Sequence, residues 1–64
     1  MRKSEGYLEE ALKEYNAKVD EYDENGTVEQ RLEAYLNRGS ILSMMDSYVS
    51  ALTDFDEAVE IIQL

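Results

Sequence analysis

Residues 48–62, YVSALTDFDEAVEII, place apolar side chains at steps of three and four along the whole stretch. The apolar positions are Tyr48, Ala51, Leu52, Phe55, Ala58, Val59 and Ile62. This spacing is typical of one face of an α-helix. The acidic residues of the stretch, Asp54, Asp56, Glu57 and Glu60, are then expected to face water. The pattern predicts a helix over about residues 47–63 and no strand.

Two more helices are predicted upstream by the same spacing. Leu8, Ala11, Leu12, Tyr15, Val19 and Tyr22 indicate a helix over about residues 4–23, and Val28, Leu32, Tyr35, Leu36, Gly39, Leu42 and Met45 indicate one over about residues 28–44. Thr27 and Gln30 fit a capping box at the start of the second helix. Gly26 is expected to end the first helix in the left-handed conformation, and Asp46 or Ser47 to cap the third.

Composition limits the classes of function. The chain has 64 residues, enough for one small domain, and 15 acidic against 6 basic residues give a formal net charge of -9. Nucleic acid and anionic membranes are therefore not expected partners. Histidine and cysteine are absent, so neither a catalytic site nor a cofactor or metal is expected. No apolar segment is long enough for a signal or a membrane span, and we expect a soluble, cytoplasmic protein.

The stretch from Leu32 to Gln63 resembles one tetratricopeptide repeat (TPR) without its terminal proline. In this alignment the family's signature positions in its helices A and B are Tyr35, Gly39, Leu42, Tyr48, Ala51, Phe55 and Ala58. The predicted first helix resembles helix B of a preceding repeat, with Leu8, Ala11, Leu12 and Tyr15 at the matching places. The resemblance implies an all-α fold of three antiparallel helices, a TPR-like hairpin plus one packing helix.

Small residues give the signature a physical meaning. Two helices approach to about 8–10 Å only where the side chains between them are small, and Gly39, Ala51 and Ala58 would provide that gap. Aromatic rings from Tyr35, Tyr48 and Phe55 are expected to insert around the gap. We therefore interpret the aromatic residues as packing and assign them no catalytic role.

The resemblance also implies a binding site. Members of the family bind extended or helical peptides in a groove lined by their A helices, and the matching positions here are Glu33, Leu36, Asn37, Ser40, Ser43 and Met44. Asn37 is similar to the asparagine of co-chaperone repeats that hold a C-terminal carboxylate, but the accompanying lysines have no counterpart in this sequence. A single A helix is also small compared with a standard interface of about 800 Å² per partner.

A remote alternative is calcium binding in the connection between the first two helices. With Gly26 as the sixth residue of a calcium loop, Glu21, Asp23 and Asn25 would occupy the first, third and fifth places. The twelfth place, which should hold a glutamate, is Leu32. The plainer interpretation is a polar end of a helix.

Apolar residues beyond those of the predicted core suggest assembly. Ile41, Met44, Val49, Ile61, Ile62 and Leu64 are too many for the surface of a monomer of this size. We expect a protein or peptide partner, further repeats of a longer protein, or a second copy in a two-fold dimer. Because residues 44–47 lack glycine, the last two helices could also fuse and swap between chains. The expected function is a non-catalytic interaction or assembly module, with a purely structural acidic dimer as the alternative.

Overall fold

The computed structural model describes the backbone of residues 3–63 and, within it, the side chains of residues 6–63. It contains three helices in this range, α1 (Lys3–Asn25), α2 (Val28–Met44) and α3 (Tyr48–Gln63), and no strand. The predicted all-α fold with three helices is confirmed. The helix α2 has the bounds expected from the sequence, whereas α1 continues two residues beyond its expected end at residue 23.

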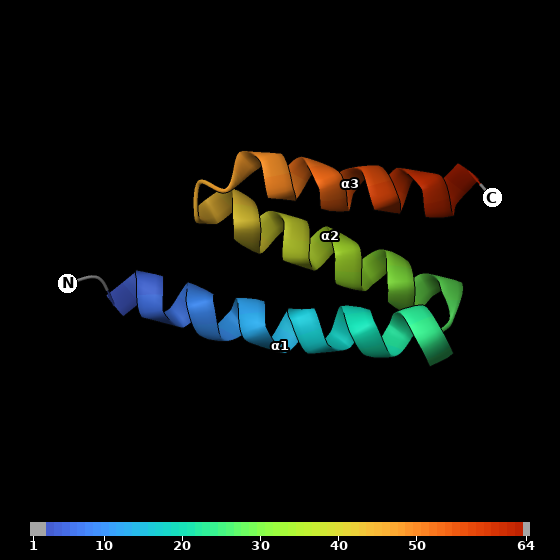
Figure 1. Ribbon diagram of the computed structural model, residues 1–64, viewed down its shortest axis with the longest axis horizontal. Coiled ribbons are helices and arrows are strands. Elements are labelled where there is room, and N and C mark those ends of the chain that lie inside the picture. The colour runs from blue at the N-terminus through green and yellow to red at the C-terminus, as the bar shows by residue number, and fades with distance from the viewer. Residues whose placement is uncertain (1–2, 64) are drawn as a thin grey trace.

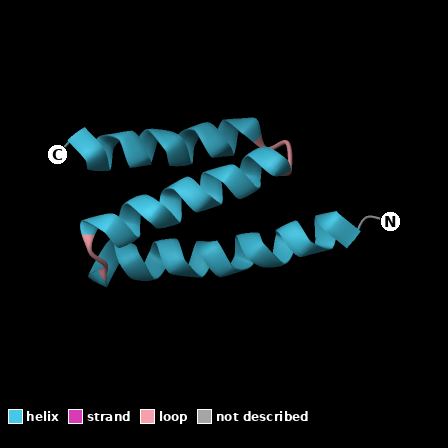
Figure 2. Cartoon of the chain, turned by 180° about the vertical axis from the view of Figure 1, so that it is seen from behind, coloured by secondary structure: helices cyan, strands magenta, loops and turns pink. Residues whose placement is uncertain are grey.

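The three helices lie side by side in one layer (Figure 1). The middle helix α2 packs against α1 on one side and α3 on the other, while α1 and α3 have no contact within the described residues. The molecule extends over 42 × 21 × 12 Å and is thinnest across the layer. The view from behind shows the same order (Figure 2). Both broad faces of the layer are consequently open.

The connection between α1 and α2 consists of Gly26 and Thr27. The predicted capping box is confirmed: the Gln30 amide donates to the Thr27 hydroxyl at 3.1 Å, and the Thr27 amide donates to the Gln30 side chain at 3.0 Å. The left-handed conformation predicted for Gly26 is wrong, since no described glycine has a positive φ. Glycine is required here because a Cβ would lie only 2.7 Å from the backbone Cα of Tyr22.

The connection between α2 and α3 places a non-glycine residue in the left-handed region. Asp46 has a φ of 64°, a conformation that aspartate tolerates better than most residues. Its amide donates to the Ser43 carbonyl at 3.0 Å and the Ser47 amide to the Leu42 carbonyl at 2.8 Å, which together form a Schellman motif. Asp46 thus ends α2 without a glycine, and α2 and α3 are two antiparallel helices in this chain, not one fused helix.

The core lies along both sides of α2. Val19, Ala34, Tyr35, Ala58 and Ile61 form a buried cluster, against which Tyr22 and Leu32 pack. Gly39, Ala51 and Ala58 are buried as predicted, so the small residues do lie where helices approach each other.

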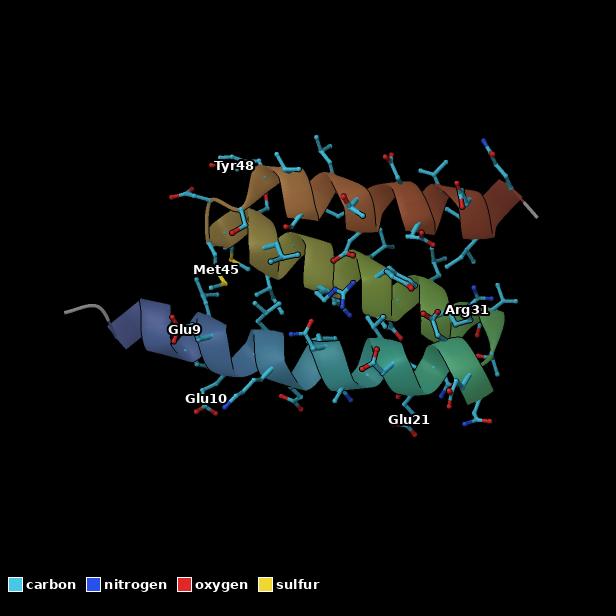
Figure 3. The ribbon with its side chains drawn as sticks, viewed as in Figure 1. Glu9, Glu10, Glu21, Arg31, Met45 and Tyr48 are labelled. Carbon is cyan, nitrogen blue, oxygen red and sulfur yellow. The ribbon has the colours of Figure 1, made fainter. Side chains whose placement is uncertain are left out.

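Some predicted exposures on α2 and α3 are wrong. Ile41 and Ile61, expected among the surplus apolar residues, are buried, while Leu64 lies outside the described residues. Tyr48, predicted to insert into the core, is 59% exposed and points outward from the start of α3 (Figure 3). Asp54, predicted to face water, is only 2% exposed. The reason is that Asp54 shares the side of α3 that carries Ala51 and Ala58, and that side faces α2.

Candidate protein-interaction site

All six predicted groove residues lie on α2, and four of them share its open side. Glu33, Leu36, Ser40 and Met44 are exposed and are spaced so that they follow one another along the helix; we call them the α2 row. Leu36 is 41% exposed and Met44 is 62% exposed. Asn37 and Ser43 are half-buried beside the row. The row combines two apolar side chains with polar neighbours, which suits contact with another protein more than chemistry.

Two shallow hollows border the α2 row. Glu29, Leu32, Glu33 and Leu36 line the first, on α2 alone. The second lies between α1 and α2 and is lined by Tyr15, Lys18, Tyr22, Gln30, Glu33, Ala34 and Asn37. Asn37 and Lys18 of α1 therefore line the same hollow, which the sequence alone did not predict. Glu33 is the residue that the two hollows share.

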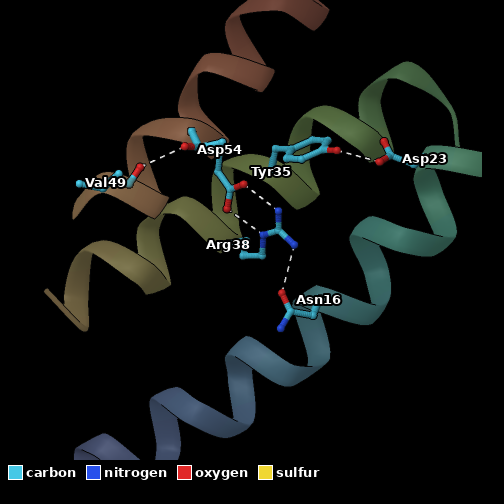
Figure 4. Close-up of polar contacts among 7 residues, drawn as sticks. Asn16, Asp23, Tyr35, Arg38, Val49 and Asp54 are labelled. Carbon is cyan, nitrogen blue, oxygen red and sulfur yellow. Dashed lines mark hydrogen bonds and ion pairs between the residues drawn. The ribbon is translucent and has the colours of Figure 1, made fainter. Parts of the chain in front are cut away.

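Arg38 joins all three helices, a role that the sequence analysis missed. Its Nε and Nη2 atoms donate to the two carboxylate oxygens of Asp54 on α3, both at 2.7 Å, and its Nη1 atom donates to the Asn16 side chain on α1 at 3.0 Å (Figure 4). The hydrogen bonds to Asp54 raise the pKa of Arg38. Because each guanidinium nitrogen already has a partner, we assign this cluster to packing and not to ligand binding.

A second polar contact holds α1 to α2. The Tyr35 hydroxyl donates to Asp23 at 2.7 Å, and the Arg31 Nε atom lies 3.5 Å from the other oxygen of the same carboxylate. Burial of the ring, together with the hydrogen bond to Asp23, raises the pKa of Tyr35 to about 12. Both arginines of α2 are thus directed to acidic residues of neighbouring helices.

The connection between α1 and α2 does not form a twelve-residue loop. Glu21, Asp23 and Asn25 belong to α1, and only Gly26 and Thr27 lie outside a helix. Within the part of the chain that the structure describes, no three acidic side chains are grouped so that they could hold a metal ion. Across the same residues, no helix combines the length and apolar character needed to cross a membrane.

The outer side of α3 is a second exposed apolar surface. Tyr48, Leu52, Val59 and Ile62 are 48% to 64% exposed. Helical spacing did not predict this surface, because nearly all apolar residues of α3 fit one packed face. Of these four residues, only Ile62 was among the surplus apolar residues expected from the sequence.

The fold and these surfaces define a small all-α domain of three helices in one layer. Comparisons with protein families, curated proteins and solved structures gave no match to this chain.

Proposed function

We propose that this chain is a non-catalytic protein–protein interaction or assembly module of TPR type. The observation that carries the proposal is the single layer of helices with large apolar side chains on its open faces. Leu36 and Met44 on α2 are exposed although small residues of the same helix are buried. Covering such side chains stabilises an association by about 25 cal/mol for each Å² of apolar surface removed from water.

Three features support the TPR type. The Phe55 ring lies directly over Gly39, Ala51 and Ala58 are buried against α2, and each helix contacts only its neighbours in the chain, as in helical repeats. Two features depart from the family's usual pattern. Tyr48 is exposed, and a charged residue, Arg38, precedes Gly39 and pairs with Asp54.

The proposed contact surface for a partner is the α2 row, flanked by Asn37 and Ser43. A peptide crossing this row would cover Leu36 and Met44 and could form hydrogen bonds with Ser40 and Asn37. Because one helix offers less area than a standard interface, we expect weak, reversible binding unless the partner also covers neighbouring surfaces.

The proposal is tested by immobilising the full chain and identifying the proteins it retains from a cell extract. Leu36→Lys/Met44→Lys should abolish retention of a specific partner, because both changes place a charge on the α2 row. Tyr7→Lys is the matched control, since Tyr7 is 75% exposed and belongs to α1, not to that row. Equal retention by the wild type and the Leu36→Lys/Met44→Lys variant would contradict the proposed surface.

The alternative is a structural acidic dimer, and the exposed apolar side of α3 is the observation that favours it. Sedimentation at several protein concentrations separates the two proposals. A dimer should show a concentration-dependent mass and retain mainly its own chain, whereas a module for other partners should stay monomeric when alone.

A further inference from the structure

The helix α3 packs its small side chains, Ile61 and the Phe55 ring toward α2 and leaves four other apolar side chains exposed. Ala51 and Ala58 are buried against α2. Tyr48, Leu52, Val59 and Ile62 are exposed, and we call these four residues the α3 stripe. An apolar helix face normally packs inward, so this outward arrangement marks the stripe as a surface that another molecule can cover.

The spacing of the α3 stripe fits a helical partner. The four exposed positions follow at steps of four, seven and three residues, and Phe55, which lies between Leu52 and Val59 in the sequence, turns its ring onto Gly39 of α2. Steps of this kind are those by which one helix packs its side chains between those of another helix. The helix has 16 residues and is therefore about 24 Å long, enough for about four turns of a partner.

The border of the α3 stripe is acidic and lacks compensating charge. Residues 46–63 contain Asp46, Asp54, Asp56, Glu57 and Glu60 and no basic residue. Asp56 and Glu60 are exposed and one helical turn apart, on the flank of the stripe. The two arginines of α2 cannot neutralise this flank, because Arg31 and Arg38 are directed to Asp23 and Asp54.

We propose that the α3 stripe docks a basic amphipathic helix of another protein. Its apolar residues would cover Leu52 and Val59, and lysine or arginine side chains on its flank would face Asp56 and Glu60. A second copy of this chain fits less well. It would bring the same acidic flank and a chain of net charge -9 against an identical one.

The α3 stripe and the α2 row share no residue, so variants of one or the other test the two proposals independently. Leu36→Lys/Met44→Lys, which should remove binding at the α2 row, is expected to leave docking at the α3 stripe in place.

The test uses the full chain and three labelled synthetic helical peptides, with binding followed by fluorescence anisotropy. The first has leucines at the spacing of the stripe and flanking lysines, the second has glutamates in place of the lysines, and the third is a scrambled form of the first. We expect the first peptide to bind about tenfold or more tightly than either of the others. Its affinity should fall when the salt is raised from about 50 to about 500 mM.

Variants of exposed residues separate docking from general attraction between opposite charges. Leu52→Ser/Val59→Ser should weaken binding of the lysine peptide by about tenfold or more, while the control Tyr7→Ser should not. Asp56→Lys/Glu60→Lys should shift the preference toward the glutamate peptide. Circular dichroism would verify that each variant keeps its helix content.

Three results would overturn the proposal. One is equal binding of the lysine peptide and its scrambled form, and another is unchanged binding by Leu52→Ser/Val59→Ser. The third is a wild-type dimer in sedimentation that Leu52→Ser/Val59→Ser dissociates, because the stripe would then be covered by a second copy of this chain.

Discussion

At the scale of single residues, Gly39 decides how closely α2 and α3 pack. A Cβ at this position would lie 2.6 Å from Cε1 and 2.9 Å from Cζ of Phe55, much closer than carbon atoms can approach. The aromatic ring therefore occupies the space that a side chain at Gly39 would need. Gly6 is a natural comparison, because a Cβ there would have no neighbouring atom within 4 Å.

Gly39→Ala should lower the free energy of unfolding by roughly 1–2 kcal/mol, because the clash outweighs the gain of about 1 kcal/mol in helix propensity. Urea denaturation measures the difference. Gly6→Ala, the control, should be neutral or slightly stabilising. In a Phe55→Leu background, Gly39→Ala should also become neutral or stabilising, and additive effects of the two changes would contradict the proposed contact.

At the scale of the elements, the Arg38–Asp54 pair connects the three helices. Asp54 is 2% exposed, whereas the Arg38 side chain is 21% exposed and reaches Asn16 on α1. A buried carboxylate is tolerated only when it is paired, so the stability of the folded chain depends on Arg38 to compensate the charge of Asp54. The Cζ atom of the same arginine lies 5.6 Å from the centre of the Tyr35 ring, a cation–π contact within α2.

Arg38→Met should destabilise the chain by roughly 2–4 kcal/mol, because it leaves the Asp54 carboxylate buried without its partner; the partial exposure of Arg38 keeps the cost moderate. Arg38→Met/Asp54→Leu should recover most of this loss, because no uncompensated charge remains. Thermal and urea denaturation of the two variants provide the comparison. A double variant as unstable as Arg38→Met would show that the pair contributes more than charge compensation.

At the scale of the whole molecule, stability rests on two narrow contacts in one layer, to which polar groups contribute. Tyr35 belongs to the core cluster, and its hydroxyl holds Asp23 of α1. Burial raises its pKa to about 12, so the folded chain favours the neutral phenol. The molecule already carries a net charge of -9, and a further negative charge within the layer would act against folding.

The free energy of unfolding should therefore depend on pH in the alkaline range. The contribution of Tyr35 is complete below its ordinary pKa of about 10 and is lost as the pH rises from there through about 12. Urea denaturation between about pH 9 and 12 measures this loss. Tyr35→Phe should flatten the decline, whereas Tyr7→Phe, which removes an exposed tyrosine, should not; parallel curves for all three proteins would refute the assignment.

Much of the secondary structure could be read from the sequence, because the signals are local. Helical spacing identified the three helices, and Thr27 with Gln30 identified the start of α2. The small residues Gly39, Ala51 and Ala58 also indicated where helices approach. For the candidate site, the resemblance to the TPR family indicated Leu36, Ser40 and Met44, but it did not predict that Asn37 lines the hollow between α1 and α2.

The sequence alone determined which residues share a helix face, because a period of 3.6 residues is a property of one segment. It did not determine how much of the apolar face of α3 packs inward, because spacing grouped Tyr48 and Leu52 with Ala51 and Ala58. The tertiary structure decided that choice: the side with Ala51, Asp54 and Ala58 approaches α2 closely, with Arg38 placed to pair with Asp54, and Tyr48 remains outside. Close approach of two backbones depends on the partner helix, and no single segment of the sequence contains that information.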